Sequence, residues 1–199
     1  FNFNHKLISI GRGLSIVFAQ GCFYLSIMNL EYATAATLVF STPIFLTALS
    51  VPILGNAVGY WRWSAVLLGF LGIVIIVRPG SDIFSIYALL PLGAAFGYAL
   101  SSVLVKLFPK EVHTTNIQLY TQLTTLIAAI LICGFTLSFS KISSFYDLFL
   151  LAIIGFTGGT GVIFLIWGYR LTEPSLIAPF EYFGLPIAFA LGWIFFSEN

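Results

Sequence analysis

The sequence contains very few charged residues. Only 8% of its 199 residues are Asp, Glu, Lys or Arg, whereas an ordinary soluble domain has roughly 25%. Hydrophobic residues make up 59% of the chain, and its mean hydropathy is +1.04. A soluble domain of this length has a single core and could not hide so much apolar surface from water. The composition therefore predicts an integral membrane protein in contact with a lipid bilayer.

Residues typical of other functional classes are also scarce. The eight basic and seven acidic residues form no run, so nucleic acid is not expected as a partner. Cys22 and Cys133 lie in apolar stretches without a CxxC spacing, which argues against a disulfide framework or a zinc site. His5 and His113 have no neighbouring ligand set, and no Walker-type GxxxxGK[ST] occurs. We expect no catalytic residues, no cofactor and no metal site, and predict that the protein is not an enzyme.

Long apolar stretches are what the sequence does contain. A helix needs about 20 mostly apolar residues to cross the hydrocarbon core of a membrane. The connectors between such stretches are brief, which leaves no room for a separate soluble domain. The sequence predicts an all-α, polytopic membrane bundle with seven helices: Gly13 to Leu30, Ala33 to Leu54, Arg62 to Val77, Ile86 to Leu107, Gln118 to Phe139, Leu148 to Tyr169, and Pro174 to Phe196.

The distribution of basic residues predicts an orientation. Basic residues near membrane spans are retained on the cytoplasmic side. If the N-terminal end of the chain is cytoplasmic, six basic residues fall on that side and two on the other. We therefore expect a multi-pass protein of the cytoplasmic membrane with its N-terminal end inside. The six are Lys6, Arg12, Arg62, Lys106, Lys110 and Arg170, and the two are Arg78 and Lys141.

Two segments of the chain share a pattern. The segment LEYATAATLVFSTPIFLTALSVPILGN begins at Leu30, and LTEPSLIAPFEYFGLPIAFALGWIFFSEN begins at Leu171. Each has a mid-helix proline followed by Ile, Pro43 in the first and Pro186 in the second, with an Asn thirteen residues later. The two helices are five crossings apart, so they would run in opposite directions. Inverted repeats of this kind are typical of secondary transporters.

At these residues the chain resembles the drug/metabolite transporter superfamily, in particular its EamA-type members. The resemblance is carried by NLEYATAATLVFSTPIF, WRWSAVLLGFLGIVIIVRPG and LTEPSLIAPFEYFGLPIAFALGWIFFSE. It implies ten transmembrane helices in two inverted five-helix repeats. Residues 1–80 would then be the C-terminal part of the first repeat and residues 84–199 most of the second. The chain begins without Met and stops directly after an apolar run, so we interpret it as a fragment that lacks the first two helices and the last one.

Glu181 is the main candidate for a functional residue. It is the only carboxylate well inside a predicted span, where an ionised side chain is costly unless it is paired or faces water. It could couple transport to protons, contact a cationic group of the substrate, or serve as a structural carboxylate between helices.

Further candidates accompany this carboxylate. Pro43 and Pro186 leave backbone carbonyls unpaired, which a membrane tolerates only where protein or a cavity satisfies them, and Ser41 and Thr42 could either repair that backbone or face substrate. The other substrate-pathway candidates are Tyr182, beside Glu181; Gln20, Tyr24 and Tyr98, by resemblance; and Trp167, which shares a helix face with Thr157 and Thr160.

Two further patterns predict helix packing. Gly93, Gly97 and Ser101 form one small-residue ridge, and Gly155 and Gly159 form another. The polar face of Gln118, Gln122 and Thr125 is expected to make interhelical hydrogen bonds.

The leading hypothesis for function is a secondary transporter. It would move a small organic metabolite, such as an amino acid, an amine or a nucleoside-like compound, across the cytoplasmic membrane by alternating access. Because the sequence has no ATP-binding motif, we expect either coupling to a gradient of protons or another ion, or facilitated exchange. The alternative is a membrane-embedded scaffold or receptor without transport activity, or a membrane enzyme.

Overall fold

The computed structural model describes residues 3–30, 32–55, 58–77, 86–136 and 144–184, and within these ranges every regular element is a helix. The prediction of an all-α polytopic bundle is confirmed. The α-helices are α1 (Phe3–Ile27), α2 (Tyr32–Val39), α3 (Thr42–Leu54), α4 (Tyr60–Val77), α5 (Leu89–Leu104), α6 (Thr114–Thr136), α7 (Phe145–Leu171) and α8 (Pro174–Glu181), and the 3₁₀ turns η1 (Ile86–Ala88) and η2 (Val105–Leu107) flank α5.

Five helical segments are long and apolar enough to cross a membrane. They are His5–Ile27, Thr34–Leu54, Leu89–Leu107, Thr114–Phe135 and Phe145–Leu171. Each coincides with one of the seven predicted spans, and the third predicted span coincides with α4. The seventh begins as predicted at Pro174, but its C-terminal part lies outside the described residues.

The first span differs from its prediction. We expected it to begin at Gly13, with Arg12 as a flanking charge, whereas α1 begins ten residues earlier at Phe3 and places Arg12 in its interior. The prediction assumed that a charged side chain ends a membrane span. Arg12 does not end the helix, because it is buried and hydrogen-bonded to two other helices. Arg12 therefore does not belong among the flanking basic residues.

The second span is broken where the sequence predicted a proline kink. Helix α2 ends at Val39 and α3 begins at Thr42, with Pro43 in its first turn, where a missing N–H is tolerated. The hydroxyl of Ser41 donates to Leu38 O at 2.7 Å, and that of Thr42 donates to Val39 O at 2.6 Å. Leu38 O also accepts the backbone N–H of Ser41 at 3.1 Å, so the two hydroxyls add hydrogen bonds to the carbonyls at the break, which is one of the two roles considered for them.

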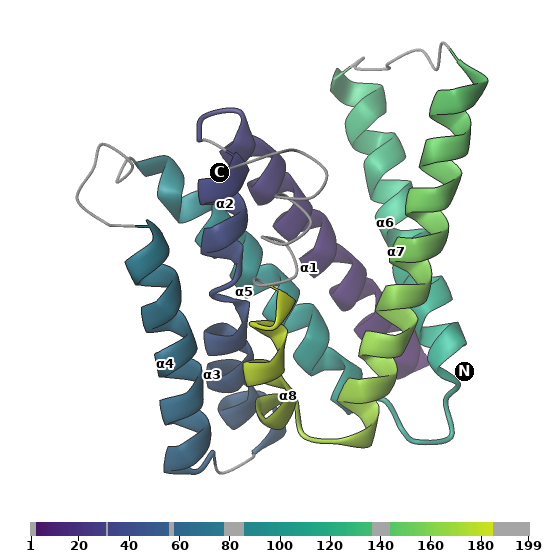
Figure 1. Ribbon diagram of the computed structural model, residues 1–199. Coiled ribbons are helices and arrows are strands. Elements are labelled where there is room, and N and C mark those ends of the chain that lie inside the picture. The colour runs from purple at the N-terminus through teal and green to yellow at the C-terminus, as the bar shows by residue number, and fades with distance from the viewer. Residues whose placement is uncertain (1–2, 31, 56–57, 78–85, 137–143, 185–199) are drawn as a thin grey trace.

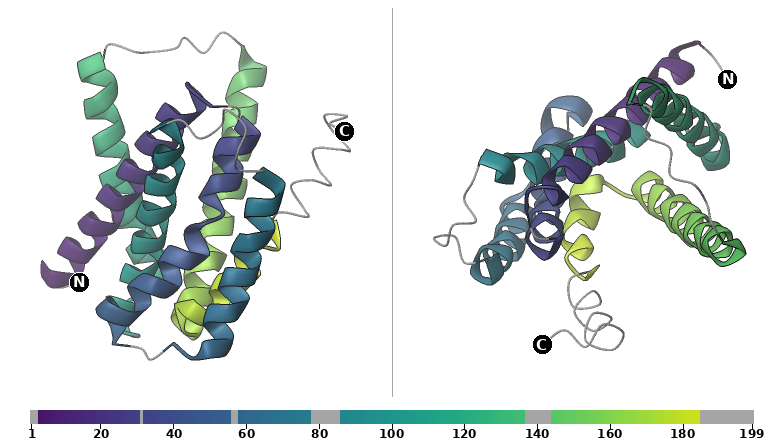
Figure 2. Two further views of the ribbon diagram at one scale, coloured as in Figure 1. Left: turned by 90° about the vertical axis from the view of Figure 1, so that its left-hand side faces the viewer. Right: turned by 90° about the horizontal axis from the view of Figure 1, so that it is seen from above.

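The helices are arranged in two groups (Figure 1). Helix α3 packs against α5 and α8, α4 contacts α3 and α8, and α1 lies along both α5 and α6. Seen from above, α6 and α7 extend to one side of this group, and α7 stands apart along most of its length (Figure 2, right). A cluster of buried side chains joins the lower ends of α3, α4, α5, α7 and α8; it includes Leu46, Val66, Val103, Ile166 and Ala178. The far end of α7 is exposed, so the two groups diverge from a shared base.

Small residues allow α1 and α5 to approach closely. A Cβ added at Gly97 would lie 2.8 Å from Ser15 O and 2.9 Å from the Cβ of Ala19, and Gly93 faces the Sγ of Cys22. The predicted ridge of Gly93, Gly97 and Ser101 is therefore a packing surface. The prediction that the second ridge is also a packing surface is wrong within the described residues, since a Cβ at Gly155 or Gly159 would meet nothing within 4 Å.

This contrast yields a matched pair of variants. We expect Gly97→Ala to lower the melting temperature of the detergent-solubilised protein by at least about 3 °C, because the new methyl group meets backbone across a tight helix contact. Gly155→Ala makes the same chemical change in open space and should leave the melting temperature unchanged or raise it slightly. Equal effects of the two substitutions would contradict the packing described for α1 and α5.

Candidate functional site

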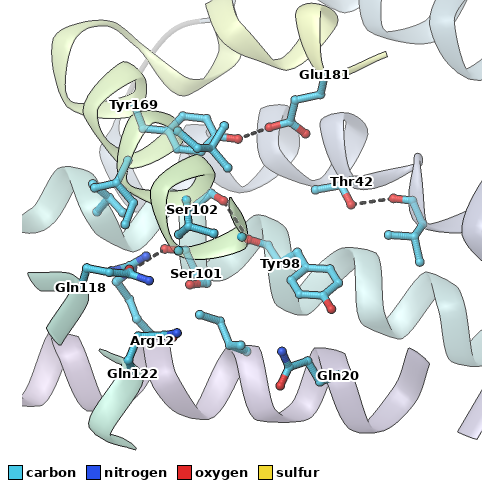
Figure 3. Close-up of a pocket in the computed structure, with 18 of the residues that line it drawn as sticks. Arg12, Gln20, Thr42, Tyr98, Ser101, Ser102, Gln118, Gln122, Tyr169 and Glu181 are labelled. Atoms are coloured by element: carbon cyan, nitrogen blue, oxygen red, sulfur yellow. Dashed lines mark hydrogen bonds between the residues drawn. The ribbon is translucent and has the colours of Figure 1, made fainter. Parts of the chain in front are cut away.

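A cavity of about 520 Å³ lies between the two groups of helices. Its lining comes from α1, α2, α3, α5, α6, α7 and α8, so that every predicted span except the third contributes. The volume is in the usual range of sites for small organic molecules. Polar lining residues converge on it from all sides (Figure 3): Arg12, Gln20, Thr42, Tyr98, Ser101, Ser102, Gln118, Gln122, Tyr169 and Glu181.

Arg12 is the basic residue of this lining. Its side chain is only 3% exposed. Its Nε donates to Ser101 O at 2.9 Å on α5, and its Nη1 donates to the hydroxyl of Thr121 at 3.0 Å on α6. Both partners are uncharged, and the ion pair found among the described residues joins Arg62 to Glu173 instead. Arg12 thus connects three helices while its positive charge meets no carboxylate in the described structure.

Glu181 is the carboxyl-bearing residue of the cavity lining. It is the last residue of α8 and is half-buried. The hydroxyl of Tyr169, a side chain of α7 that is 1% exposed, donates a hydrogen bond to Glu181 Oε1. In Figure 3, Glu181 and Tyr169 lie on one side of the cavity and Arg12 and Gln118 on the opposite side. The sequence-based expectation that Glu181 lies inside the bundle agrees with this placement, while its functional role stays a prediction.

The hydrogen bonding of Gln118 differs from the prediction. We expected the polar face of α6 to be used for interhelical hydrogen bonds, and Thr121 does accept one from Arg12. The side chain of Gln118 is 7% exposed and lines the cavity, yet its Oε1 has no hydrogen-bond partner in the described part of the chain. Gln122, one turn further along α6, also lines the cavity.

The structure separates the other predicted site residues into two sets. Gln20, Thr42, Pro43 and Tyr98 line the cavity together with Glu181. Four other candidates either do not line the cavity or lie outside the residues that the structure describes. Ser41 is buried at the helix break, Tyr24 and Trp167 are 61% and 57% exposed, and Pro186 lies outside the described residues.

Tyr182 is also placed away from the cavity lining. Its ring packs against Gly69 of α4, where an added Cβ would come within 2.3 Å of it, and its hydroxyl donates to Val66 O at 3.3 Å. Its position is that of a packing residue between α4 and the segment after α8.

Sequence reasoning missed Arg12 and Tyr169. Arg12 was assigned to a membrane flank because it precedes an apolar run, although Arg12, Ile16 and Gln20 follow an i, i+4, i+8 spacing and share one helix face. That spacing was the available signal, since Gln20 was already a candidate. Trp167 was chosen on α7 instead of Tyr169, because the 3-4-3 spacing of polar and aromatic residues selected a face that the structure exposes.

A bundle of apolar helices around a mainly apolar cavity with several polar side chains defines a multi-pass membrane protein with an internal cavity large enough for a small molecule. No family model matches the chain. It is 24% identical over 195 residues to the S-adenosylmethionine uptake transporter of Rickettsia felis, covering 98% of the chain and 65% of that protein. It is 32% identical over 166 residues to the riboflavin transporter of Rhizobium johnstonii, covering 82% of the chain and 53% of that protein.

A third relative is the pseudopaline exporter CntI of Pseudomonas aeruginosa, which is 28% identical over 192 residues, covering 94% of the chain and 66% of that protein. All three homologues are named as membrane transporters. Their names give different substrates and include both an uptake transporter and an exporter. The chain spans 65% of the length of the Rickettsia felis relative and 53% of the riboflavin transporter.

Cysteine labelling can check which residues face the cavity. In the full-length protein with Cys22 and Cys133 replaced by Ala, we expect Thr42→Cys and Gln122→Cys to react with a charged, membrane-impermeant thiol reagent at least about tenfold faster than Tyr24→Cys and Trp167→Cys. Thiolates form in a hydrated polar cavity and not against lipid. All four should react alike after denaturation. Faster labelling at Trp167→Cys than at Thr42→Cys would contradict the assignment of the cavity.

Proposed function

We propose that the protein is a secondary transporter of the EamA-type drug/metabolite transporter class, which moves a small organic metabolite by alternating access. The observation that carries the proposal is the composition of the cavity. Thr42 and Pro43 come from the proposed first repeat, whereas Tyr98, Gln118 and Glu181 come from the proposed second repeat. Movement of one repeat against the other would therefore change the access to a site that both repeats form.

The directions of two helices support the inverted repeat. When Pro186 is aligned with Pro43, helix α8 corresponds to α2, and α8 packs against α3, which continues the same predicted span as α2. In Figure 1 the chain descends through α2 and α3 and ascends through α8. This antiparallel contact agrees with repeats at residues 1–80 and 84–199 that are related by inversion.

The proposed substrate is an amino acid, an amine or a nucleoside-like compound. The named substrates of the relatives, S-adenosylmethionine, riboflavin and pseudopaline, are polar organic molecules. The cavity offers charged and hydrogen-bonding groups in a volume suited to such molecules. Glu181 would either bind a coupling proton or contact a cationic group of the substrate.

We further propose that the N-terminal end of the chain is cytoplasmic. When Arg12 is left out of the flanking residues, five basic residues lie on the proposed cytoplasmic side and two on the other side. The excess of basic residues therefore stays on the same side. Several of the five hold connectors together at one end of the bundle. Arg62 pairs with Glu173, and Arg170 donates to Pro109 O at 2.7 Å and to the hydroxyl of Thr114 at 3.0 Å.

A cysteine at exposed Glu111 in intact cells should react with an impermeant reagent only after the membrane is opened.

Transport itself is the decisive test. Metabolite profiles of cells with and without the intact gene should differ in a few polar solutes, and proteoliposomes containing the full-length protein should move the same solutes. S-adenosylmethionine, riboflavin and the amino acids form the initial test set. A protein that binds these solutes without moving them across the vesicle membrane would instead be a receptor, which is the alternative function.

The role of Glu181 can be examined in the same vesicles over a range of pH. We expect Glu181→Gln to abolish gradient-driven accumulation while allowing solute exchange if the carboxylate couples protons, and to weaken binding of cationic solutes at every pH if it contacts substrate. Glu173→Gln, in the ion pair outside the cavity, is the matched control. Normal transport by Glu181→Gln at all pH values would rule out both roles.

A further inference from the structure

The two ends of the cavity carry opposite charges that the described protein does not neutralise. We infer that this cavity recognises a zwitterionic solute, with its anionic group at Arg12 and Gln118 and its cationic group at Glu181. The inference rests on the proposed transport function and adds the charge pattern of the substrate.

The first observation concerns Arg12. Its Nε and Nη1 hydrogen bonds go to a backbone carbonyl and a threonine hydroxyl, and its Nη2 has no hydrogen bond to the described residues. A buried guanidinium is stable when its donors are satisfied and its charge is balanced. A carboxylate or phosphate on a bound solute would supply that balance, and a pair of its oxygens suits the free side of the guanidinium.

Gln118 is a second polar side chain at the same place whose hydrogen bonding is incomplete. Its amide is more than nine-tenths buried, and its Oε1 has no partner in the described ranges, although buried polar atoms are nearly always hydrogen-bonded. An amide can turn either its oxygen or its NH₂ group toward a ligand. Gln118 and Arg12 lie together in Figure 3, so the amide can donate to the same anionic group that the guanidinium binds.

Glu181 provides the complementary end. Its one hydrogen bond within the described structure comes from Tyr169, and a carboxylate can accept about four. The remaining lone pairs suit an ammonium group, which has several N–H donors. Figure 3 shows Ser101 and Ser102 between this carboxylate and the group of Arg12 and Gln118, with Tyr98 to one side. A solute with both charges on a small scaffold would satisfy both ends, whereas a solute with one charge would leave the other end uncompensated.

Matched derivatives of one amino acid can test this inference. Proteoliposomes of the full-length protein are given a mixture of L-phenylalanine, L-phenylalaninamide and N-acetyl-L-phenylalanine, the same three forms of methionine, and neutral nucleosides and vitamins. The accumulated solutes are quantified by mass spectrometry against vesicles without protein. We expect the zwitterions to accumulate at least about tenfold more than the amides or the N-acetyl forms, since each modification removes one charge-assisted contact.

Two substitutions should then change different ratios. Glu181→Gln should reduce the preference for the free amine over the N-acetyl form, and Gln118→Leu should reduce the preference for the carboxylate over the amide. Glu111→Gln, an exposed connector residue, should change neither ratio. Because each ratio is measured within one preparation, lower expression or partial misfolding does not affect it. Arg12 is left unchanged, since its hydrogen bonds hold three helices together.

The outcomes separate the two proposals. Accumulation of neutral or singly charged solutes with no preference for zwitterions would overturn the inference and leave the transporter function intact. Loss of both preferences in either variant would show that the two ends are not separate contacts, which also overturns it. If no solute accumulates above the level of protein-free vesicles, both the transporter function and the inference fail.

Discussion

The described structure depends on a charged side chain inside a membrane helix. Arg12 is buried in α1, and its donors reach a carbonyl of α5 and a hydroxyl of α6. An unpaired guanidinium in this position would be too costly to keep, so the three helices are constrained to present acceptors to it. Close contact between α1 and α5 at Gly97 brings Ser101 into the same region, and the result is a polar wall around which the cavity forms.

The opposite wall depends on backbone groups. Pro43 begins α3 after a break in the second span, and hydroxyls of Ser41 and Thr42 satisfy carbonyls at that break. A broken helix is tolerated at membrane depth where protein or a polar cavity replaces the missing hydrogen bonds. Thr42 and Pro43 also line the cavity, so the same residues that allow the break shape the site.

Much of the fold could be predicted because lipid imposes a simple rule on composition. The predicted apolar stretches correspond to helices over most of the part of the chain that the structure describes, and the proline at position 43 marks a real break. The start of α1 could not be predicted, since hydropathy treats Arg12 as a terminator and cannot register acceptors that tertiary contacts supply. Among the cavity-lining residues, Glu181 was predicted from its rarity inside a membrane span, Thr42 from its place beside Pro43, and Gln20 and Tyr98 from resemblance. The role of Tyr169 in the lining could not be predicted, because the sequence does not show which face of α7 turns inward.

The energetic character of the cavity favours a carrier over a scaffold. Packing alone accounts for the hydrogen bonds of Arg12 to α5 and α6, but it does not account for the Oε1 of Gln118, which has no hydrogen-bond partner in the described part of the chain. In a carrier, a bound solute that matches Arg12, Gln118 and Glu181 would lower the cost of closing the cavity around them. On the proposed function, the charge pattern would link recognition to movement, because the groups that select the solute would be those whose desolvation opposes closure without it.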